Sequence, residues 1–136
     1  MKIYFSGSIR GGRQDAGLYR QLINELKKYG TVLTEHIGSE SFDHSKIDRQ
    51  IHDEDMAWLR ESDIVIAEVT TPSLGVGYEI GRAIEIGKRV VCLYREINGD
   101  SVSAMIKGSS EIERFTYTDF MHAAEIFDKM FESMEI

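Results

Sequence analysis

The sequence contains one cysteine and one proline among 136 residues, and none of its apolar runs approaches the length of a membrane span. The single cysteine, Cys92, excludes a disulfide framework within the chain. Its place in the apolar run 90–93 favours a buried structural thiol over a reactive one. The N-terminal residues follow a strand pattern rather than that of a signal peptide. We therefore expect an intracellular protein without membrane association, cytoplasmic or, in a eukaryote, also nuclear.

Positive charge is also scarce, because 16 lysines and arginines stand against 23 aspartates and glutamates, for a formal net charge of −7. This balance argues against a broad surface for nucleic-acid polymers. It leaves room for a small anionic ligand, since backbone amides and a few local cations decide such binding. No cysteine–histidine cluster has zinc spacing, and the four histidines are scattered. We expect no metal site and no cofactor.

Apolar runs alternate with helical patterns along the whole chain, whose length suits one domain, residues 1–136, with a single packed core. Strands are expected at 2–6, 31–34, 63–69 and 89–94, with an edge strand at 115–117. Helices are expected at 15–29, 46–61, 74–86 and 119–134. This order predicts an α/β fold with a doubly wound, Rossmann- or flavodoxin-like sheet of five mainly parallel strands and helices on both faces.

Residues 70–83 hold the only proline and three glycines, and they lead from the apolar run 64–67 into a helical pattern. Such a segment places a helix N-terminus at the carboxyl edge of a parallel sheet, where open α/β sheets bind ligands. Glu79 falls inside the apolar stripe of this helix, where a carboxylate costs free energy unless it is paired or faces a cavity. Glu79 is therefore a candidate pocket residue. The alternative is a rim carboxylate near a helix start, where acidic residues are common.

Asp55 holds a comparable position among the apolar residues of the predicted helix 46–61, and its alternative is a stripe-edge residue satisfied by water or a lysine. Two carboxylates on pocket-facing stripes suit glycosyl transfer, in which one attacks the anomeric carbon and the other handles the leaving-group proton. We expect the helix N-terminus to keep Glu79 ionised and an apolar setting to hold Asp55 protonated.

A glycine-rich turn at 7–13 follows the first predicted strand and matches neither the dinucleotide fingerprint nor a Walker loop. Its amides, hydroxyl and guanidiniums suit a small oxyanion, and a plain strand-to-helix turn with solvated arginines is the alternative. Glu68 is interpreted as a structural residue or as one that supports the site without contacting substrate, and His36 is given a supporting role at most. On the pattern alone, segment 102–108 is a surface turn that packs Met105 and Ile106 inward.

Five blocks of sequence also stand in a recognisable order and spacing: YFSGSIRGGR at 4–13, LTEH at 33–36, IHDEDMAWL at 51–59, PSLGVGYE at 72–79 and SAMI at 103–106. Together they resemble the 2′-deoxynucleoside 5′-phosphate N-hydrolases, a branch of the nucleoside 2-deoxyribosyltransferase-like fold. The resemblance extends over nearly the whole chain. It implies that Glu79 is the nucleophile that forms a covalent deoxyribosyl 5-phosphate intermediate, that Asp55 is the general acid/base, and that Tyr4 orients the nucleophile.

The resemblance also implies how the substrate's phosphate is held. Ser8, Arg10 and Ser73 match 5′-phosphate ligands, and Ser103 matches a phosphate ligand donated by the neighbouring subunit. Met105 is expected to pack at that same interface. This replaces the surface-turn interpretation and implies an obligate homodimer. The residues expected to shape the rest of the pocket are Gly7, Ile9 and Gly75.

The expected activity is therefore hydrolysis of the N-glycosidic bond of 2′-deoxynucleoside 5′-monophosphates, with retention at the anomeric carbon. A 2′-hydroxyl withdraws electrons and disfavours the cationic transition state, so deoxy substrates are favoured. Three alternatives stay open: a nucleoside 2-deoxyribosyltransferase, a ribonucleotide (CMP-type) N-hydrolase and a non-catalytic nucleotide-binding sensor. The loop 38–45 departs most from the family pattern, and no base preference is predicted.

Overall fold

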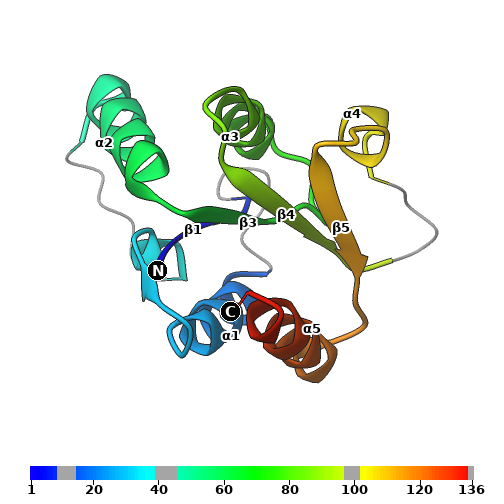
Figure 1. Ribbon diagram of the computed structural model, residues 1–136. Coiled ribbons are helices and arrows are strands. Elements are labelled where there is room, and N and C mark those ends of the chain that lie inside the picture. Colours follow the sequence, from blue (N-terminus) through cyan, green and yellow to red (C-terminus); the bar gives the residue numbers. More distant parts are fainter. Residues whose placement is uncertain (9–14, 39–45, 97–101, 135–136) are drawn as a thin grey trace.

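The computed structural model describes residues 1–8, 15–38, 46–96 and 102–134. Five parallel strands form one sheet in the order β2-β1-β3-β4-β5 (Figure 1). They are β1 (Lys2–Ser6), β2 (Thr31–Val32), β3 (Ile64–Glu68), β4 (Arg89–Tyr94) and β5 (Ile112–Thr116). This is the flavodoxin-like strand order, whose ligand site lies where the order reverses, between β1 and β3. The predicted fold class is confirmed.

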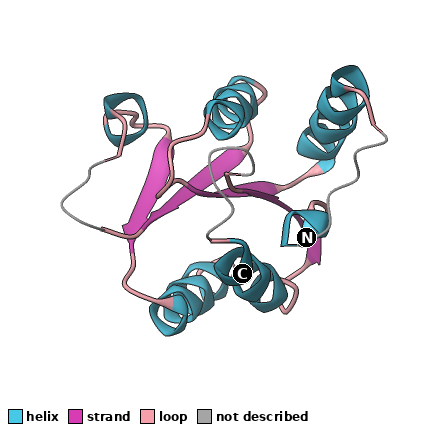
Figure 2. Ribbon diagram, turned by 180° about the vertical axis from the view of Figure 1, so that it is seen from behind, coloured by secondary structure: helices cyan, strands magenta, loops and turns pink. Residues whose placement is uncertain are grey.

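Helices cover both faces of the sheet (Figures 1 and 2). On one face lie α1 (Ala16–Leu26) and α5 (Phe120–Glu132), and on the other lie α2 (Asp48–Glu61), α3 (Leu74–Glu85) and the short α4 (Ala104–Lys107). A 3₁₀ turn, η1 (Glu35–Gly38), follows β2. No described helix combines the length and the apolar character that a membrane crossing requires.

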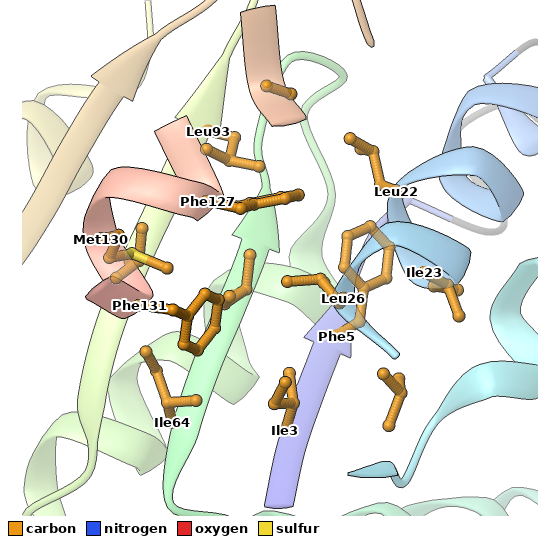
Figure 3. Packing of buried hydrophobic residues seen from close by; sticks show 14 of the residues in the cluster. Ile3, Phe5, Leu22, Ile23, Leu26, Ile64, Leu93, Phe127, Met130 and Phe131 are labelled. Atoms are coloured by element: carbon orange, nitrogen blue, oxygen red, sulfur yellow. The ribbon is translucent and has the colours of Figure 1, made fainter. Parts of the chain in front are cut away.

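Alternation along the strands divides the core into two layers. Ile3 and Phe5 of β1 pack with α1 and α5, and Figure 3 shows these side chains in one apolar layer with Leu22, Leu26 and Phe127. Tyr4 belongs instead to the layer under α2 and α3. Successive side chains of a strand point to opposite faces, so Ser6 follows Tyr4 onto the α2/α3 face. The face that holds the predicted catalytic carboxylates thus also receives Tyr4 and Ser6.

The predicted elements form with small shifts in their bounds, and two differences have clear causes. β5 begins at Ile112, earlier than the expected 115–117. The sequence pattern missed its start because Glu113 and Arg114 are polar and most residues of this edge strand are exposed. In α4, Ile106 packs against the α3 layer while Met105 is 82% exposed. The surface-turn interpretation, which buried both side chains, therefore fails for Met105. The loop 38–45 lies outside the described residues, apart from Gly38 at the end of η1.

Candidate active site

A cavity of about 320 Å³ opens at the carboxyl edge of the sheet, and its lining comes from the end of β1, from α2 and from the start of α3. Asp55 of α2 and Glu79 of α3 both line it. The structure therefore brings together the two carboxylates that the sequence singled out. Three further predicted residues share the lining: Gly7, Ser73 and Gly75.

Glu79 lies in the second turn of α3, and its Oε2 is buried without a hydrogen-bond partner among the described residues. Burial raises the pKa of Glu79 to about 7, and the charge of Asp55 adds to the rise. The hydroxyls of Tyr4 and Ser6 lie close enough to favour the ionised carboxylate and partly offset it. An unpaired buried acid of this kind is typical of a functional site.

Burial also raises the pKa of Asp55, to about 6, with the neighbouring Glu54 adding to the rise and Lys46 opposing it. The expected order of the two pKa values is therefore reversed, because Glu79 is the weaker acid. The pKa of Glu79 is raised because of the position of this residue in α3. The field of a helix N-terminus is confined to the first turn, so in the second turn of α3 desolvation outweighs it.

Tyr4 is fully buried in β1, and burial followed by the charges of Glu79 and Asp55 raises the pKa of its phenol. The phenol thus stays protonated and is available as a donor, since neither its oxygen nor that of Ser6 has a hydrogen-bond partner among the described residues. Sequence reasoning missed Ser6. Its position two residues after Tyr4 on the same strand face was the available signal.

The predicted phosphate ligands lie at the same sheet edge. Ser8 is buried, its Oγ has no hydrogen-bond partner among the described residues, and its N–H donates to the hydroxyl of Tyr19 at 3.2 Å. Ser73 caps α3, where its Oγ accepts the N–H of Val76 at 3.3 Å. The predicted pocket residues Ile9 and Arg10 lie outside the described residues.

The glycines of the cavity differ in what they require. A Cβ on Gly7 would lie 2.9 Å from the ring of Tyr19, so this position has no room for a side chain. Gly75 has only the Oγ of Ser73 near its Cβ position, at 3.9 Å, so the space there is open. Gly7 is thus required by packing against α1, whereas the structure gives Gly75 no such constraint.

Ser103 and Met105 do not line the carboxylate cavity of their own chain. They line an adjacent hollow of about 580 Å³ between the start of α3 and α4, to which Ser73 and Tyr78 also contribute. Ser103 caps α4, its Oγ accepting the N–H of Met105 at 3.2 Å. Within one chain these two predicted residues therefore stand beside the site rather than in it.

A polar link spans the mouth of the cavity. The hydroxyl of Tyr78 on α3 lies 2.8 Å from Nε2 of His52 on α2 and accepts from Nη1 of Arg82 at 2.6 Å. His52 and Tyr78 both line the cavity; Tyr78 directly precedes Glu79, and His52 stands one helical turn before Asp55. Sequence reasoning missed this pair, because neither residue breaks the amphipathic pattern of its helix.

The nucleoside 2-deoxyribosyltransferase family model matches residues 3–124. The chain belongs to this family. A protein of Tetraodon nigroviridis named 5-hydroxymethyl-dUMP N-hydrolase is 51% identical over 125 residues, covering 88% of each chain. A protein of Danio rerio with the same name is 46% identical over 140 aligned positions, covering 98% of each.

A solved structure shares the deoxyribosyltransferase-family fold. The CMP N-glycosidase of Clostridium botulinum superposes with a TM-score of 0.72 at 21% identity, covering 95% of this chain and 99% of that one. Such an identity shows the common fold alone. In the part of this chain that the structure describes, no three His, Cys, Asp or Glu side chains lie together in a way that could hold a metal ion.

Proposed function

We propose that this protein hydrolyses the N-glycosidic bond of 2′-deoxynucleoside 5′-monophosphates and releases a free base and 2-deoxyribose 5-phosphate. The observation that carries the proposal is the convergence of Asp55 and Glu79 on one cavity, each with its pKa raised by burial. The N-hydrolase names of the relatives support the same reaction. 5-Hydroxymethyl-dUMP, the substrate in those names, is the first to test.

The chemistry follows from the two environments. In the first step the bond from C1′ to the base breaks, an oxygen of Glu79 bonds to C1′, and Asp55 gives its proton to the departing base. In the second step water attacks C1′, Asp55 takes the water's proton, and Glu79 leaves as a carboxylate. The hydroxyls of Tyr4 and Ser6 favour that carboxylate, and so does the positive charge that develops on the sugar. Retention requires carboxyl groups about 5–5.5 Å apart in the working complex.

The direct test is a panel of ribo- and deoxynucleoside monophosphates, 5-hydroxymethyl-dUMP among them, assayed for free base. We expect release from deoxynucleotides and far less from the matching ribonucleotides. With an acceptor base added, new nucleotide in quantity would make the protein a transferase. Preference for CMP would make it a ribonucleotide hydrolase, and binding without turnover a sensor.

The phosphate end of the substrate is proposed to bind at Ser8 and Ser73, with Arg10 as the cation that the family resemblance implies. Helix N-termini favour anions, and Ser73 begins α3. The phosphate does not react, so its binding energy can be used to orient the sugar over Glu79.

We expect Ser73→Ala to raise KM for a deoxynucleoside monophosphate by about tenfold, the effect of one lost hydrogen bond to a charged group. The Ki of the unphosphorylated deoxynucleoside as a competitive inhibitor should stay unchanged. Ser133→Ala removes a hydroxyl just beyond α5, bonded to the carbonyl of Met130, and serves as the control. Equal losses on both ligands would argue against phosphate recognition at Ser73.

The pH dependence of kcat/KM should be bell-shaped, with its maximum between the pKa values of about 6 for Asp55 and about 7 for Glu79. The reactive form has Glu79 ionised and Asp55 protonated, and with these pKa values it is a minor form that is most populated between them. At lower pH both groups are protonated and Glu79 cannot attack, and at higher pH both are ionised and Asp55 cannot protonate the base. The pair titrates with two apparent values that belong to both groups. Initial rates at low substrate across the pH range would check this, and a rate still rising above about pH 8 would contradict it.

We further propose that the protein acts as a homodimer in which Ser103 and Met105 complete the neighbouring subunit's site. Leu74 and Met105 are 96% and 82% exposed, and Tyr78 is exposed beside them. They border the hollow between α3 and α4, next to the carboxylate cavity. Exposed apolar side chains gathered around a concave surface favour a protein partner.

Met105→Asp should convert the dimer to a monomer, because two charges would be buried in an isologous interface. Sedimentation at micromolar concentration would measure the change, and activity should fall together with dimer content. Met121→Asp, at an exposed position of α5, is the matched control and should remain dimeric. A monomeric wild type with full activity would refute the shared site.

A further inference from the structure

A buried ionic network lies at the carboxyl edge of the sheet, outside the carboxylate cavity. Its centre is Glu68, the last residue of β3, which is fully buried. Its carboxylate accepts the N–H of Thr70 at 2.7 Å, the Thr70 hydroxyl at 2.9 Å and the hydroxyl of Tyr117. Arg95, after β4, completes an ion pair with it, Nε lying 3.6 Å from Oε2.

Arg95 extends this network to the start of α1. Its Nη2 donates to Oδ2 of Asp15 at 2.7 Å, and its backbone N–H donates to the Thr70 hydroxyl at 2.9 Å. Asp15 is the N-cap residue of α1, yet its carboxylate makes no cap hydrogen bond. Aspartate usually stabilises a helix by capping it, so here that role gives way to the contact with Arg95.

Each end of the network connects to one of the two turns, at Ser8 and at Ser73, that are proposed to bind the phosphate. Thr70 opens the segment that ends at Ser73. On the other side, Tyr19 stands one helical turn beyond Asp15, and its hydroxyl accepts the N–H of Ser8 at 3.2 Å. The ring of Tyr19 also fills the space beside Gly7.

We propose that Glu68, Arg95 and Asp15 form a brace that fixes the turn at Ser8 relative to the turn at Ser73, with Tyr19 as its contact to Ser8. The brace rests on the proposed function, because phosphate binding is what it positions. These are positioning residues, since none of the three brace residues lines the cavity that holds the reacting carboxylates.

The physical argument is preorganisation. A buried ion pair rarely adds stability over apolar packing, but one whose carboxylate is well hydrogen-bonded holds its members in one arrangement. Here the Glu68 carboxylate accepts from three donors, and Nε of Arg95 faces it at 3.6 Å as a cation without a hydrogen-bond partner of its own among the described residues. A phosphate that binds two turns from different strands gains affinity when their separation is set beforehand.

The test compares two arginines at opposite ends of β4. Arg95→Gln breaks the brace, whereas Arg89→Gln breaks a bidentate ion pair with Glu113 at the other edge of the sheet. For Arg95→Gln we expect KM for a deoxynucleoside monophosphate to rise about tenfold and kcat to stay within about twofold. The Ki of the unphosphorylated deoxynucleoside should not move. Arg89→Gln should change none of the three.

A second pair of variants removes single hydroxyls without changing any charge, so that an effect on KM can be separated from a folding defect. Tyr19→Phe removes only the hydroxyl that holds Ser8. Tyr29→Phe removes a hydroxyl in the turn after α1, which donates to Asp128 of α5 at 3.2 Å. Only Tyr19→Phe should raise KM for the monophosphate, by about threefold to tenfold.

An unchanged KM in Arg95→Gln and Tyr19→Phe, with active wild type, would overturn the brace and leave the proposed function standing. A parallel loss of kcat, of nucleoside affinity and of melting temperature would show a purely structural network and would overturn it as well. If wild type released no base from any monophosphate, the proposed function would fail first.

Discussion

Glu79→Ala is expected to lower kcat for base release by roughly a thousandfold or more, because it removes the carboxylate that is assigned to form the covalent intermediate at C1′. The fold should remain. Glu79 carries a buried oxygen without a hydrogen-bond partner among the described residues and a pKa raised to about 7, so its ionised form is destabilising in the empty site. We therefore expect the melting temperature of Glu79→Ala to equal or exceed that of wild type at pH 7.

Both the rate of base release and the melting temperature of Glu79→Ala should be measured, because the prediction is that the rate falls while the stability does not. Single-turnover assays would give the rate of base release, and thermal unfolding would give the melting temperature. Glu85→Ala, an exposed glutamate on the same helix, is the control and should leave both unchanged. Near-wild-type turnover in Glu79→Ala would end the nucleophile assignment, whatever its stability.

Asp55→Asn should lower kcat by about a hundredfold to ten-thousandfold, the usual contribution of a positioned general acid. The loss should depend on the leaving group, because a base that departs easily needs less help from a proton. The alkaline limb of the kcat/KM profile, assigned to loss of the Asp55 proton, should disappear. What remains is the single rise as Glu79 ionises.

A series of monophosphates with bases of different leaving ability would check both parts of this prediction across pH. Asp53→Asn is the matched control, since Asp53 is exposed on the same helix and its pKa is lowered by its hydrogen bond to His52. If Asp55→Asn kept the alkaline limb, the limb would belong to another group and the general-acid assignment would be wrong.

Much of this site could be predicted from periodicity alone. Glu79 and Asp55 each interrupt an apolar helical stripe, and strand–turn–helix order places both helices at the ligand edge of the sheet. The pKa order could not be predicted, because it depends on how deeply α3 buries the second-turn Glu79 relative to Asp55. Likewise, a pattern cannot show that the Asp15 carboxylate leaves its helix end for Arg95.

Other residues of the site could not be identified from the sequence pattern for a different reason. His52 and Tyr78 are ordinary polar residues at permitted positions, so only their proximity in three dimensions shows that they form a pair. Ser103 and Met105 were named by family resemblance, and one chain alone places them beside the cavity. β5 was placed too late because a polar edge strand has no apolar run to mark its start.

The alternation along β1 has a consequence for how this chain can change over generations. Ile3 and Phe5 contact the α1/α5 layer, while Tyr4 and Ser6, their immediate neighbours, contact the layer that holds the acids. A point mutation in this strand therefore affects either packing or chemistry. A one-residue insertion would turn the following side chains to the opposite face and so exchange the two sets, and we therefore expect β1 to tolerate substitutions better than insertions.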